Sequence, residues 1–579
     1  MLTTVLFLST ITVTPSDSYS KIENAQPGDE VVIAPGTYNF RVYLNKQGTA
    51  AMPIVIRAQD PANPPVWDMG STLVEDAPGS YTAGDRGRGC WQLVGATYYT
   101  IDSIVFTHCR TAGSNSAGIR YWGNVHNLLI RNCVFRENDN GITGGNGGSD
   151  AIVEFSEFDR NGNLSASTSA PTHNLYIYGG TFLMRYSYVH DPVQAQNFHI
   201  RAQDGTIEYN WIARGQSYEG DLMTDDDFTG AGPYAQTLTI RGNVIVQNQA
   251  PDNRGQMVAM YNDSAVGNLT LNVRMIANTV VGSGTNAAVV HLSNADGTIM
   301  DAQLSNNILS GTMRATLTEN TTVGTVSGAN NWMASGASAT GLSGTVFGAS
   351  PGFKDAANKD FTLAAGSDPI GHAMALTMGA PIAEYYRDET VTRMYRVRAS
   401  ANDIGAFEST TVGPGIGPGG AGGTGGAGGA GGAGGAGGTG GFGGTIGSGG
   451  TSGTMPQGSA ESGCGCSVGG APRPIAGLVL LITLILHRNK KVVTFFRMRP
   501  TPSPRMGGPH GRDTAVAGSV GYCCNAARER HGLAGRGARR GPRHHGSPRR
   551  GRDDHGAENR PARDQRSRWQ LFARRPRAR

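Results

Sequence analysis

One short phrase recurs seven times between Leu129 and Leu309. It consists of an aliphatic residue, two variable residues, Asn or Ser, one variable residue and an apolar residue. The copies are Leu129/Asn132/Val134, Val153/Ser156/Phe158, Met184/Ser187/Val189, Ile207/Asn210/Ile212, Ile240/Asn243/Ile245, Met275/Asn278/Val280 and Leu304/Asn307/Leu309. Successive Asn or Ser positions are 24, 31, 23, 33, 35 and 29 residues apart, a spacing typical of a solenoid.

Each copy joins two short apolar runs at an Asn or Ser, which we expect to tolerate left-handed backbone. Neither run is long enough for a helix. We therefore predict an all-β fold, a right-handed parallel β-helix whose stacked coils bury one continuous core. Equivalent Asn residues can then stack as a ladder. An ordinary β-sandwich would not place Asn at one point in every unit.

The composition divides the chain into five segments. Gly reaches 86 of 579 residues, and much of it lies in a Gly-rich run that cannot bury apolar surface and behaves as a flexible tether. Residues 1–10 are apolar but lack a positive start, so either the signal segment is abbreviated or the true start lies upstream. The predicted segments are 1–10 (signal), 11–410 (β-helix), 411–462 (tether), 463–491 (anchor) and 492–579 (Arg-rich, disordered tail).

Residues 463–491 combine Cys464 and Cys466, an apolar run over 475–486 and a basic "HRNKK". Twelve apolar residues are fewer than the roughly 20 that span a bilayer core. The order of features resembles the MYXO-CTERM sorting tag, which implies export, processing near the cysteines and anchoring at the bacterial cell surface or outer membrane. The alternative is a chance apolar segment.

The last 88 residues, 492–579, hold 21 Arg and no Lys against six acidic residues, a local charge of +15. The remaining residues carry −10, since the whole chain sums to +5. A basic tail often indicates nucleic acid. Arg without Lys, mixed with Gly, Pro and His and without periodicity, instead resembles translation of a GC-rich region in an unintended frame. We expect no nucleic-acid partner, and a monomer.

Three cysteines lie in the predicted folded domain, Cys90, Cys109 and Cys133. Their odd number and wide spacing favour neither a disulfide framework nor a zinc site. We predict three buried thiols.

Period-2 alternation decides which residues of a strand point outward. In the segments "HNLYIYG", "QNFHIRA" and "YEGDLM", the inward anchors Ile177, Ile200 and Leu222 are 23 and 22 residues apart, one coil each. The residues predicted to face solvent in one stripe are Asn174, Tyr176, Tyr178, Asn197, His199, Arg201, Glu219 and Asp221. The column is extended to Arg120 and Thr143 before it and to Tyr261 and His291 after it.

A stripe of aromatic, cationic, imidazole and carboxylate groups suits an extended acidic polymer. Tyrosines stack on sugar faces, and Arg pairs with a carboxylate through two hydrogen bonds. Imidazole is the side chain most readily tuned for proton transfer near neutral pH. An acidic polysaccharide or another glycan is therefore the predicted partner.

Residues 15–60, with "AQPGDEVVIAPGTY" and "GTAAMPIVIRAQ", resemble the opening coil of polysaccharide lyase family six, the alginate and chondroitin lyases. Residues 173–221 resemble a broader group of uncharacterised β-helix proteins, whose pattern includes Asn-x-Lys-Ser-Arg-Ala. Here Asn197, Arg201 and Ala202 match, but His199 stands in the Lys position. In the lyases a Lys base and an Arg are central to β-elimination, so the His puts direct transfer of that mechanism in doubt.

We therefore expect a uronate carboxylate to be neutralised by Arg201 or a cation, His199 to remove the adjacent proton, and Tyr176 or His190 to protonate the leaving oxygen. The alternative for His199 is a solvent-facing residue without a role. For His173 and His190 it is hydrogen bonding to turn backbone.

Three adjacent carboxylates, Asp225, Asp226 and Asp227, follow this stripe. Oxygen ligands of this kind suit Ca²⁺, which could also bridge a uronate. A solvated acidic loop is the ordinary explanation. A hydrolase would use two of the carboxylates as acid and base, but the sequence does not give their separation.

Two functions remain open on the sequence. The first is an exported, surface-anchored lyase that cleaves acidic polysaccharide by β-elimination. The second is a non-catalytic β-helix that binds glycan or acts as a rigid spacer.

Overall fold

The computed structural model describes most of the chain between residues 8 and 412, within one compact unit. The described residues are 8–80, 88–113, 115–145, 147–164, 171–224, 234–247, 256–262, 269–284, 288–293, 298–313, 318–319, 324–338, 340–377, 379–385, 389 and 393–412. The predicted anchor segment and Arg-rich tail lie outside them, as do Asp225, Asp226 and Asp227; of the predicted tether, only Thr411 and Val412 are described, and they form a strand.

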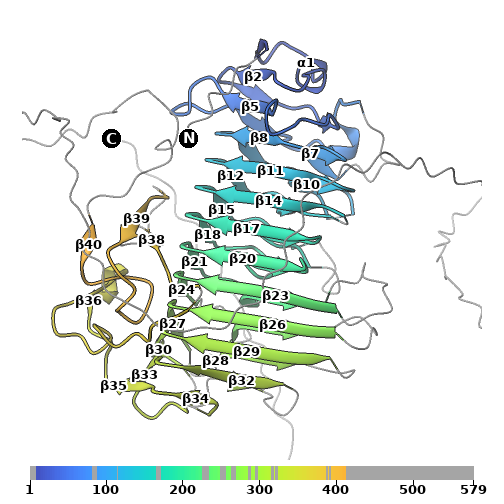
Figure 1. The fold of residues 1–579 in the computed structure, drawn as a ribbon. Helices are drawn as coiled ribbons and strands as arrows, with labels where there is room; N and C mark the ends of the chain where they lie inside the picture. Colours follow the sequence, from blue (N-terminus) through green and yellow to red (C-terminus); the bar gives the residue numbers. More distant parts are fainter. Residues whose placement is uncertain are drawn as a thin grey trace, which may run out of the picture. The chain divides into compact units, whose positions relative to one another are not determined.

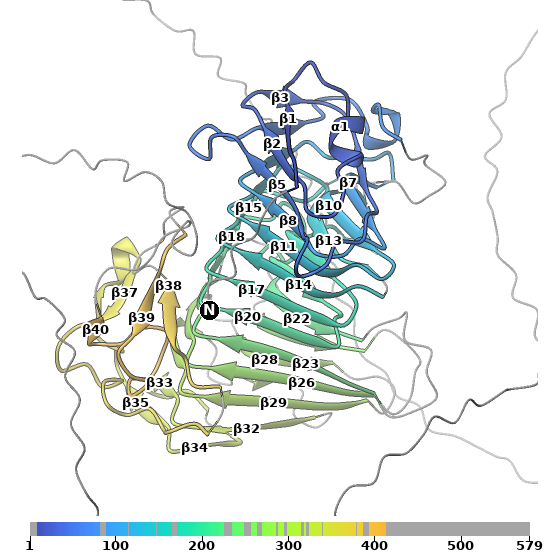
Figure 2. The ribbon, with the colours of Figure 1, turned by 45° about the horizontal axis from the view of Figure 1, so that its top comes forward.

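Three parallel sheets make up the described solenoid (Figures 1 and 2). Sheet A has 13 described strands: β1 (Thr10–Val13), β2 (Glu30–Ile33), β5 (Ile54–Ala58), β8 (Tyr99–Asp102), β11 (His126–Arg131), β14 (Ser149–Glu154), β17 (Thr181–Arg185), β20 (Asp204–Glu208), β23 (Tyr234–Arg241), β26 (Leu269–Ile276), β29 (Ile299–Ser305), β32 (Thr325–Ala329) and β34 (Leu342–Ser343).

Sheet B has 12 described strands: β3 (Thr37–Tyr38), β6 (Val66–Asp68), β9 (Val105–Thr107), β12 (Val134–Arg136), β15 (Glu157–Asp159), β18 (Tyr188–His190), β21 (Trp211–Ala213), β24 (Val244–Val246), β27 (Thr279–Ser283), β30 (Ile308–Thr312), β33 (Trp332–Ala334) and β35 (Val346–Gly348). Sheet C has ten: β4 (Val42–Leu44), β7 (Gly89–Val94), β10 (Ala117–Trp122), β13 (Asn140–Thr143), β16 (Leu175–Ile177), β19 (Phe198–Ile200), β22 (Tyr218–Met223), β25 (Gln256–Tyr261), β28 (Ala288–Ser293) and β31 (Thr318–Glu319).

Each complete coil, from β2–β4 to β29–β31, contributes one strand to each sheet, and equivalent strands of successive coils pair in parallel, as β17 does with β14 and β20. The predicted parallel β-helix is confirmed. A short helix, α1 (Ser20–Glu23), lies beside the first coil, and a 3₁₀ turn, η1 (Val74–Asp76), follows β6. None of the helices in the described segments is long and apolar enough to cross a bilayer.

The predicted ladder runs along the turn between sheets A and B. Each Asn side chain donates to the amide oxygen of the next coil's Asn, at 2.9–3.1 Å. Its members, the asparagine ladder, are Asn210, Asn243, Asn278, Asn307 and Asn331. Ser156 and Ser187 continue it toward the N-terminus by accepting backbone N–H bonds. Buried amides thereby satisfy one another inside the turn.

Two details of the repeat differ from prediction. The residue with left-handed backbone is the one before each ladder residue, as at Tyr186, Tyr209 and Ala277, where φ is 55°, 54° and 51°. The first copy is also displaced by one residue. Ile130 pairs with Val153, and Cys133 occupies the ladder position because its N–H donates to Ser156.

The core follows from the inward positions of these strands. An aromatic stack fills the first coils, with ring centroids 5.1 Å apart for Phe106 and Phe135 and 4.9 Å apart for Phe135 and Phe158. Later coils carry aliphatic residues at the equivalent positions, such as Ile212 and Ile245. Burying these side chains supplies the main driving force for stacking the coils.

The prediction of three thiols is wrong for two of the cysteines. Cys90 and Cys109, 19 residues apart, form a disulfide, and Cys133 is free and buried. Burial raises the pKa of the Cys133 thiol to about 12, so this cysteine is an inert core residue.

Residues 353–412 form a small lobe on the outer face of sheet B (Figures 1 and 2). Its elements are β36 (Phe353–Asp355), η3 (Ala356–Asn358), β37 (Asp360–Leu363), β38 (Ala383–Tyr385), β39 (Tyr395–Arg398) and β40 (Thr411–Val412). Phe361 and Tyr385 pack on Trp211, so the lobe covers apolar side chains that sheet B would otherwise expose. The segment "NDIGAFE" contributes Ala406 and Phe407 to the same cluster.

Candidate functional site

Sheet C brings the central predicted residues into one column. Thr143 pairs with Tyr176, Tyr176 with His199, and His199 with Asp221, on strands β13, β16, β19 and β22. The inward anchors Ile177, Ile200 and Leu222 pair in the same register and are fully buried. Arg120 precedes Thr143 in register, as predicted. We call Tyr176, His199, Arg201 and Asp221 the sheet C ribbon.

His199 lies between a carboxylate and a guanidinium group. Its Nδ1 is 2.7 Å from Oδ1 of Asp221, and its Nε2 accepts a 3.0 Å hydrogen bond from Nε of Arg201. The carboxylate can only accept and the guanidinium can only donate. The bond from Arg201 makes Nε2 an acceptor, while Asp221 Oδ1 and the amide nitrogen of Gln196, 3.2 Å from Nδ1, hold the other side of the ring.

Arg201 is held from several sides. Its Nη1 donates to the backbone oxygen of Thr224 at 2.9 Å, and its guanidinium lies 5.6 Å from the centre of the Tyr178 ring. Such a cation–π contact stabilises the charge in a largely desolvated position. His199 and Arg201 are each only 5% exposed and Asp221 only 1%, so the expectation of a solvent-facing stripe is wrong for all three.

Aromatic rings surround the imidazole of His199. The Tyr176 ring stands nearly perpendicular to it at 4.5 Å, and the Tyr178 hydroxyl donates to the Tyr176 oxygen. His173 stacks on His199 with centroids 4.8 Å apart. Complete burial, aided by the nearby His199 and Arg201, holds the pKa of His173 well below its usual value. His173 is therefore a neutral ring that packs against the candidate base.

Asn174, Asn197 and Glu219 do not face solvent as predicted. All three are fully buried in a second ladder, between sheets B and C. Asn174 donates to Asn197 at 2.8 Å, and Asn197 donates to Glu219 at 2.9 Å. Period-2 alternation fails here because Asn174 and Asn197 precede the first residues of β16 and β19 and lie in the turn. The 23-residue spacing of these two asparagines, so similar to that of the repeat, was the available signal.

His190 is not part of the sheet C ribbon. It belongs to β18 of sheet B, where its neighbours are Glu157, Asp159 and Asp191. It therefore cannot serve beside His199 as the proton donor of the sequence prediction, and Tyr176 remains for that role.

Tyr261 lies on sheet C but two residues from the predicted column. It pairs with Met223 and Ser293, and its hydroxyl contacts that of Tyr218. Ala259 takes the position between Asp221 and His291. His291 is in the predicted column, and its ring lies 5.8 Å from that of Tyr261.

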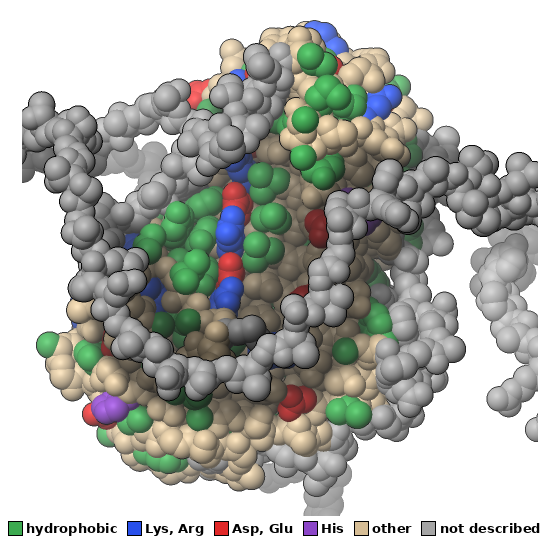
Figure 3. Space-filling model, viewed as in Figure 1, with side chains coloured by type: hydrophobic (Ala, Val, Ile, Leu, Met, Phe, Trp, Pro, Cys, Tyr) green, Lys and Arg blue, Asp and Glu red, His purple; other side chains and the backbone are tan. Residues whose placement is uncertain are grey.

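The outer face of sheet A carries a column that sequence reasoning missed. Side chains of alternating charge follow one another from coil to coil (Figure 3), with an apolar column beside them. Its members, the charge column, are Arg57, Asp102, Arg131, Glu154, Arg185, Glu208 and Arg241. The signal was present, because several of these residues stand two positions before an Asn or Ser of the repeat.

A cavity of about 540 Å³ opens on this same face of sheet A. It is lined by the apolar side chains of Leu129, Ile152 and Leu183 together with Glu208 and Arg241. The cavity lies on sheet A, whereas His199 lies on sheet C, so the cavity is not beside the candidate catalytic residues. We base the functional argument on the sheet C ribbon, because a base, a cation and a hydroxyl are brought together there in the predicted column.

No protein-family model matches this chain, and no curated protein matches it. Three solved structures similar to it are polysaccharide lyases. Pectate lyase Pel9A aligns with 15% identity and a TM-score of 0.43, over 70% of this chain and 98% of that one. An alginate lyase from Paenibacillus sp. str. FPU-7 aligns with 19% identity and a TM-score of 0.39, over 53% and 95%. A mannuronic acid specific family 6 lyase from human gut microbiota aligns with 12% identity and a TM-score of 0.32, over 56% and 86%.

Proposed function

We propose that this protein is a polysaccharide lyase that cleaves an acidic polysaccharide by β-elimination at the sheet C ribbon. The observation that carries the proposal is the Asp221–His199–Arg201 arrangement, with Tyr176 against the imidazole. It supplies an oriented base and a proton donor in one strand register, with a fixed cation two residues along the chain from the base.

The reaction divides among these groups as follows. Arg201 pairs with the uronate carboxylate, which acidifies the proton on the adjacent carbon. Nε2 of His199 removes that proton, and the released electron pair forms a carbon–carbon double bond as the bond to the glycosidic oxygen breaks. The Tyr176 hydroxyl protonates the departing oxygen. Asp221 stabilises the imidazolium that results, as an orienting carboxylate does for other histidine bases.

Substrate binding must first release the lone pair of His199. Nε of Arg201 donates to it in the structure, and a carboxylate is a stronger acceptor than a neutral imidazole. A uronate that takes over the guanidinium would therefore free Nε2 at the moment when the base is needed. This exchange couples binding of the acidic sugar to activation of the base.

The test is the ultraviolet absorbance of the unsaturated ends that elimination creates. Incubation of the wild-type protein with alginate, pectate and chondroitin, each with and without Ca²⁺, should raise absorbance with at least one polymer. Arg201→Ala should raise KM for that polymer. Absence of any rise over the whole panel, with glycan binding retained in a pull-down, would instead establish the non-catalytic glycan-binding role.

We also propose that the protein is exported and held at the bacterial surface through residues 463–491, with residues 411–462 as the tether. The ordered succession of cysteines, apolar run and basic end supports this placement. Mass spectrometry of the surface-extracted protein should show loss of the apolar run with the tether retained. An intact 60.6 kDa chain in the soluble fraction would contradict it.

A further inference from the structure

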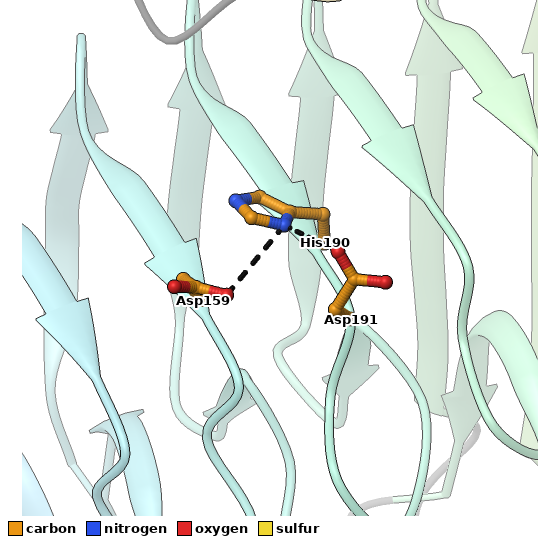
Figure 4. A group of neighbouring side chains, drawn as sticks. All are labelled: Asp159, His190 and Asp191. Atoms are coloured by element: carbon orange, nitrogen blue, oxygen red, sulfur yellow. Dashed lines mark hydrogen bonds and ion pairs between the residues drawn. The ribbon is translucent and has the colours of Figure 1, made fainter. Parts of the chain in front are cut away.

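Sheet B holds a cluster of ionisable side chains that the proposed reaction does not use. Asp159 ends β15 and His190 ends β18, and the two residues are partners in adjacent coils. Asp191 follows directly on the chain. Figure 4 shows the two carboxylates on either side of the His190 ring, with dashed lines from Nδ1 to both.

The spacing of the three ligand atoms suits a small divalent cation. One ligand atom from each residue lies within 4.8 Å of the other two. Nδ1 of His190 is 2.7 Å from Oδ2 of Asp191 and 3.7 Å from Oδ1 of Asp159. Ligands of a tetrahedral zinc ion with bonds of about 2.0–2.1 Å stand about 3.3 Å apart. The two separations from Nδ1 lie on either side of that value, so small side-chain rotations would bring the atoms toward it.

A second observation points to a ligand at this place. The Asp159 carboxylate is only 8% exposed, and its Oδ1, directed at His190, finds no hydrogen-bond donor among the described residues. Its other oxygen is held at 2.8 Å by Nη1 of Arg160. A buried anionic oxygen without a donor is costly, and a cation at this point would compensate it.

We propose that Asp159, His190 and Asp191 form a binding site for a divalent transition metal of the zinc class. Imidazole with carboxylates favours such ions over Ca²⁺ and Mg²⁺, which prefer oxygen ligands alone. Nδ1 of His190 loses its proton to the solvent on binding, and the ion takes that proton's place between His190 and Asp191. Waters complete the coordination.

The position of the site indicates a structural role that is independent of the proposed lyase reaction. Asp191 is also bound by Arg214 at 2.7 and 2.8 Å, and Arg214 pairs with Glu389, a residue of the lobe on sheet B. The ion would therefore connect strands β15 and β18 of adjacent coils, beside the contact between the solenoid and the lobe.

Isothermal titration of the full chain with ZnCl₂ tests this site, with CaCl₂ and MgCl₂ in parallel and no polysaccharide present. The wild type should show a zinc-binding step that Asp159→Asn and His190→Gln each lose. The loss should exceed about 100-fold in affinity, because even an outer-shell partner typically contributes about 10- to 100-fold. Histidines elsewhere in the chain contribute equally to all variants, so the difference isolates this site.

The matched control is His108→Gln. His108 also lies between two carboxylates, Asp68 at 2.8 Å and Glu137 at 3.3 Å, but its side chain is 37% exposed and outside the three-ligand cluster. It should keep the wild-type zinc isotherm. Equal zinc binding by wild type and His190→Gln would overturn the proposal.

A measurement on the wild type alone keeps the proposal testable if the variants fail to fold. Zinc K-edge absorption at half an equivalent of zinc should show one imidazole nitrogen and otherwise oxygen ligands. A first shell with sulfur or with several imidazoles would overturn the site.

Discussion

Two polar columns run along the solenoid at the spacing of its coils, and they differ in what they stack. The asparagine ladder stacks one residue type, whose amide both donates and accepts, so every member satisfies the next. The sheet C ribbon stacks unlike groups, with imidazole, carboxylate and guanidinium in contact. Both are buried.

The difference separates structure from chemistry. Identical neutral amides gain nothing by changing partner, so the ladder has one stable arrangement. An imidazole between an acid and a cation has a lone pair whose partner can be displaced by a stronger acceptor. A column of identical amides therefore stabilises the solenoid, whereas a column of unlike ionisable groups contains a place where proton transfer is possible.

The largest expected effect is on turnover at His199. His199→Ala should lower kcat for the active polymer by about 10²–10⁴-fold, the usual contribution of a positioned base. His199→Lys should restore part of it and move the pH optimum upward, because a lysine has its ordinary pKa near 10.4. Initial rates of ultraviolet absorbance from pH 5 to 10 measure both effects. Activity of His199→Ala equal to the wild type would remove the ribbon from the mechanism.

The matched change in the ladder should affect stability and leave chemistry unchanged. Asn278→Ala removes the acceptor for Asn243 and the donor to the Ile240 oxygen, both buried. The free energy of unfolding should fall by about 2–4 kcal/mol, since each unsatisfied buried group costs about 1–3 kcal/mol. Urea denaturation measures it.

Two further variants sharpen that result. Asn278→Ser should lower the free energy of unfolding less than Asn278→Ala does, because Ser156 and Ser187 already serve as acceptors in the same ladder. The exposed Asn63→Ala should stay within about 0.5 kcal/mol of the wild type, as surface substitutions usually do. An equal loss of stability for Asn63→Ala and Asn278→Ala would mean that a ladder amide contributes no more to stability than an exposed one.

The same contrast explains what the sequence could predict. The repeated spacing and period-2 alternation were enough to place Tyr176, His199 and Asp221 in register, because strand geometry alone determines which residues of paired strands coincide. They failed where a residue leaves the strand, as Asn174 does, because turn residues follow no period.

Other errors had a different cause. His190 was placed beside His199, although it belongs to another sheet, because nine residues of separation do not reveal where the chain turns a corner. The pairing of Cys90 with Cys109 was missed because it depends on how the intervening chain folds around the coil. The local sequence pattern predicts the strands of each coil. Which residues of different strands come into contact depends on how the chain folds between those strands.

A smaller effect should appear in the pH dependence of stability. The pKa of His173 is lowered mainly by burial, aided by the nearby His199 and Arg201, so the folded protein excludes a proton that the unfolded chain binds below pH about 6.5. Stability should therefore fall as the pH falls through that value, by up to about 1.4 kcal/mol per pH unit from this residue.

His173→Phe keeps a ring against His199 and removes the titration. Its urea midpoint should consequently depend less on pH between 7.5 and 5.5 than that of the wild type. Equal dependence in the two proteins would contradict a neutral, buried His173.

The smallest effect is expected in the charge column on sheet A, which repeats like the ladder but stands at the surface. Arg185 binds Glu154 at 2.8 Å, yet its side chain is 34% exposed. Solvent screening limits such pairs to about 0.2–1 kcal/mol. A double-mutant cycle with Arg185→Met and Glu154→Gln, measured by urea denaturation, should give a coupling in that range that shrinks in 1 M NaCl, where the screening length is about 3 Å. A salt-independent coupling above about 2 kcal/mol would place this column with the ladder, as a buried element that holds the coils together, and would show that alternation of charge can replace repetition of one amide.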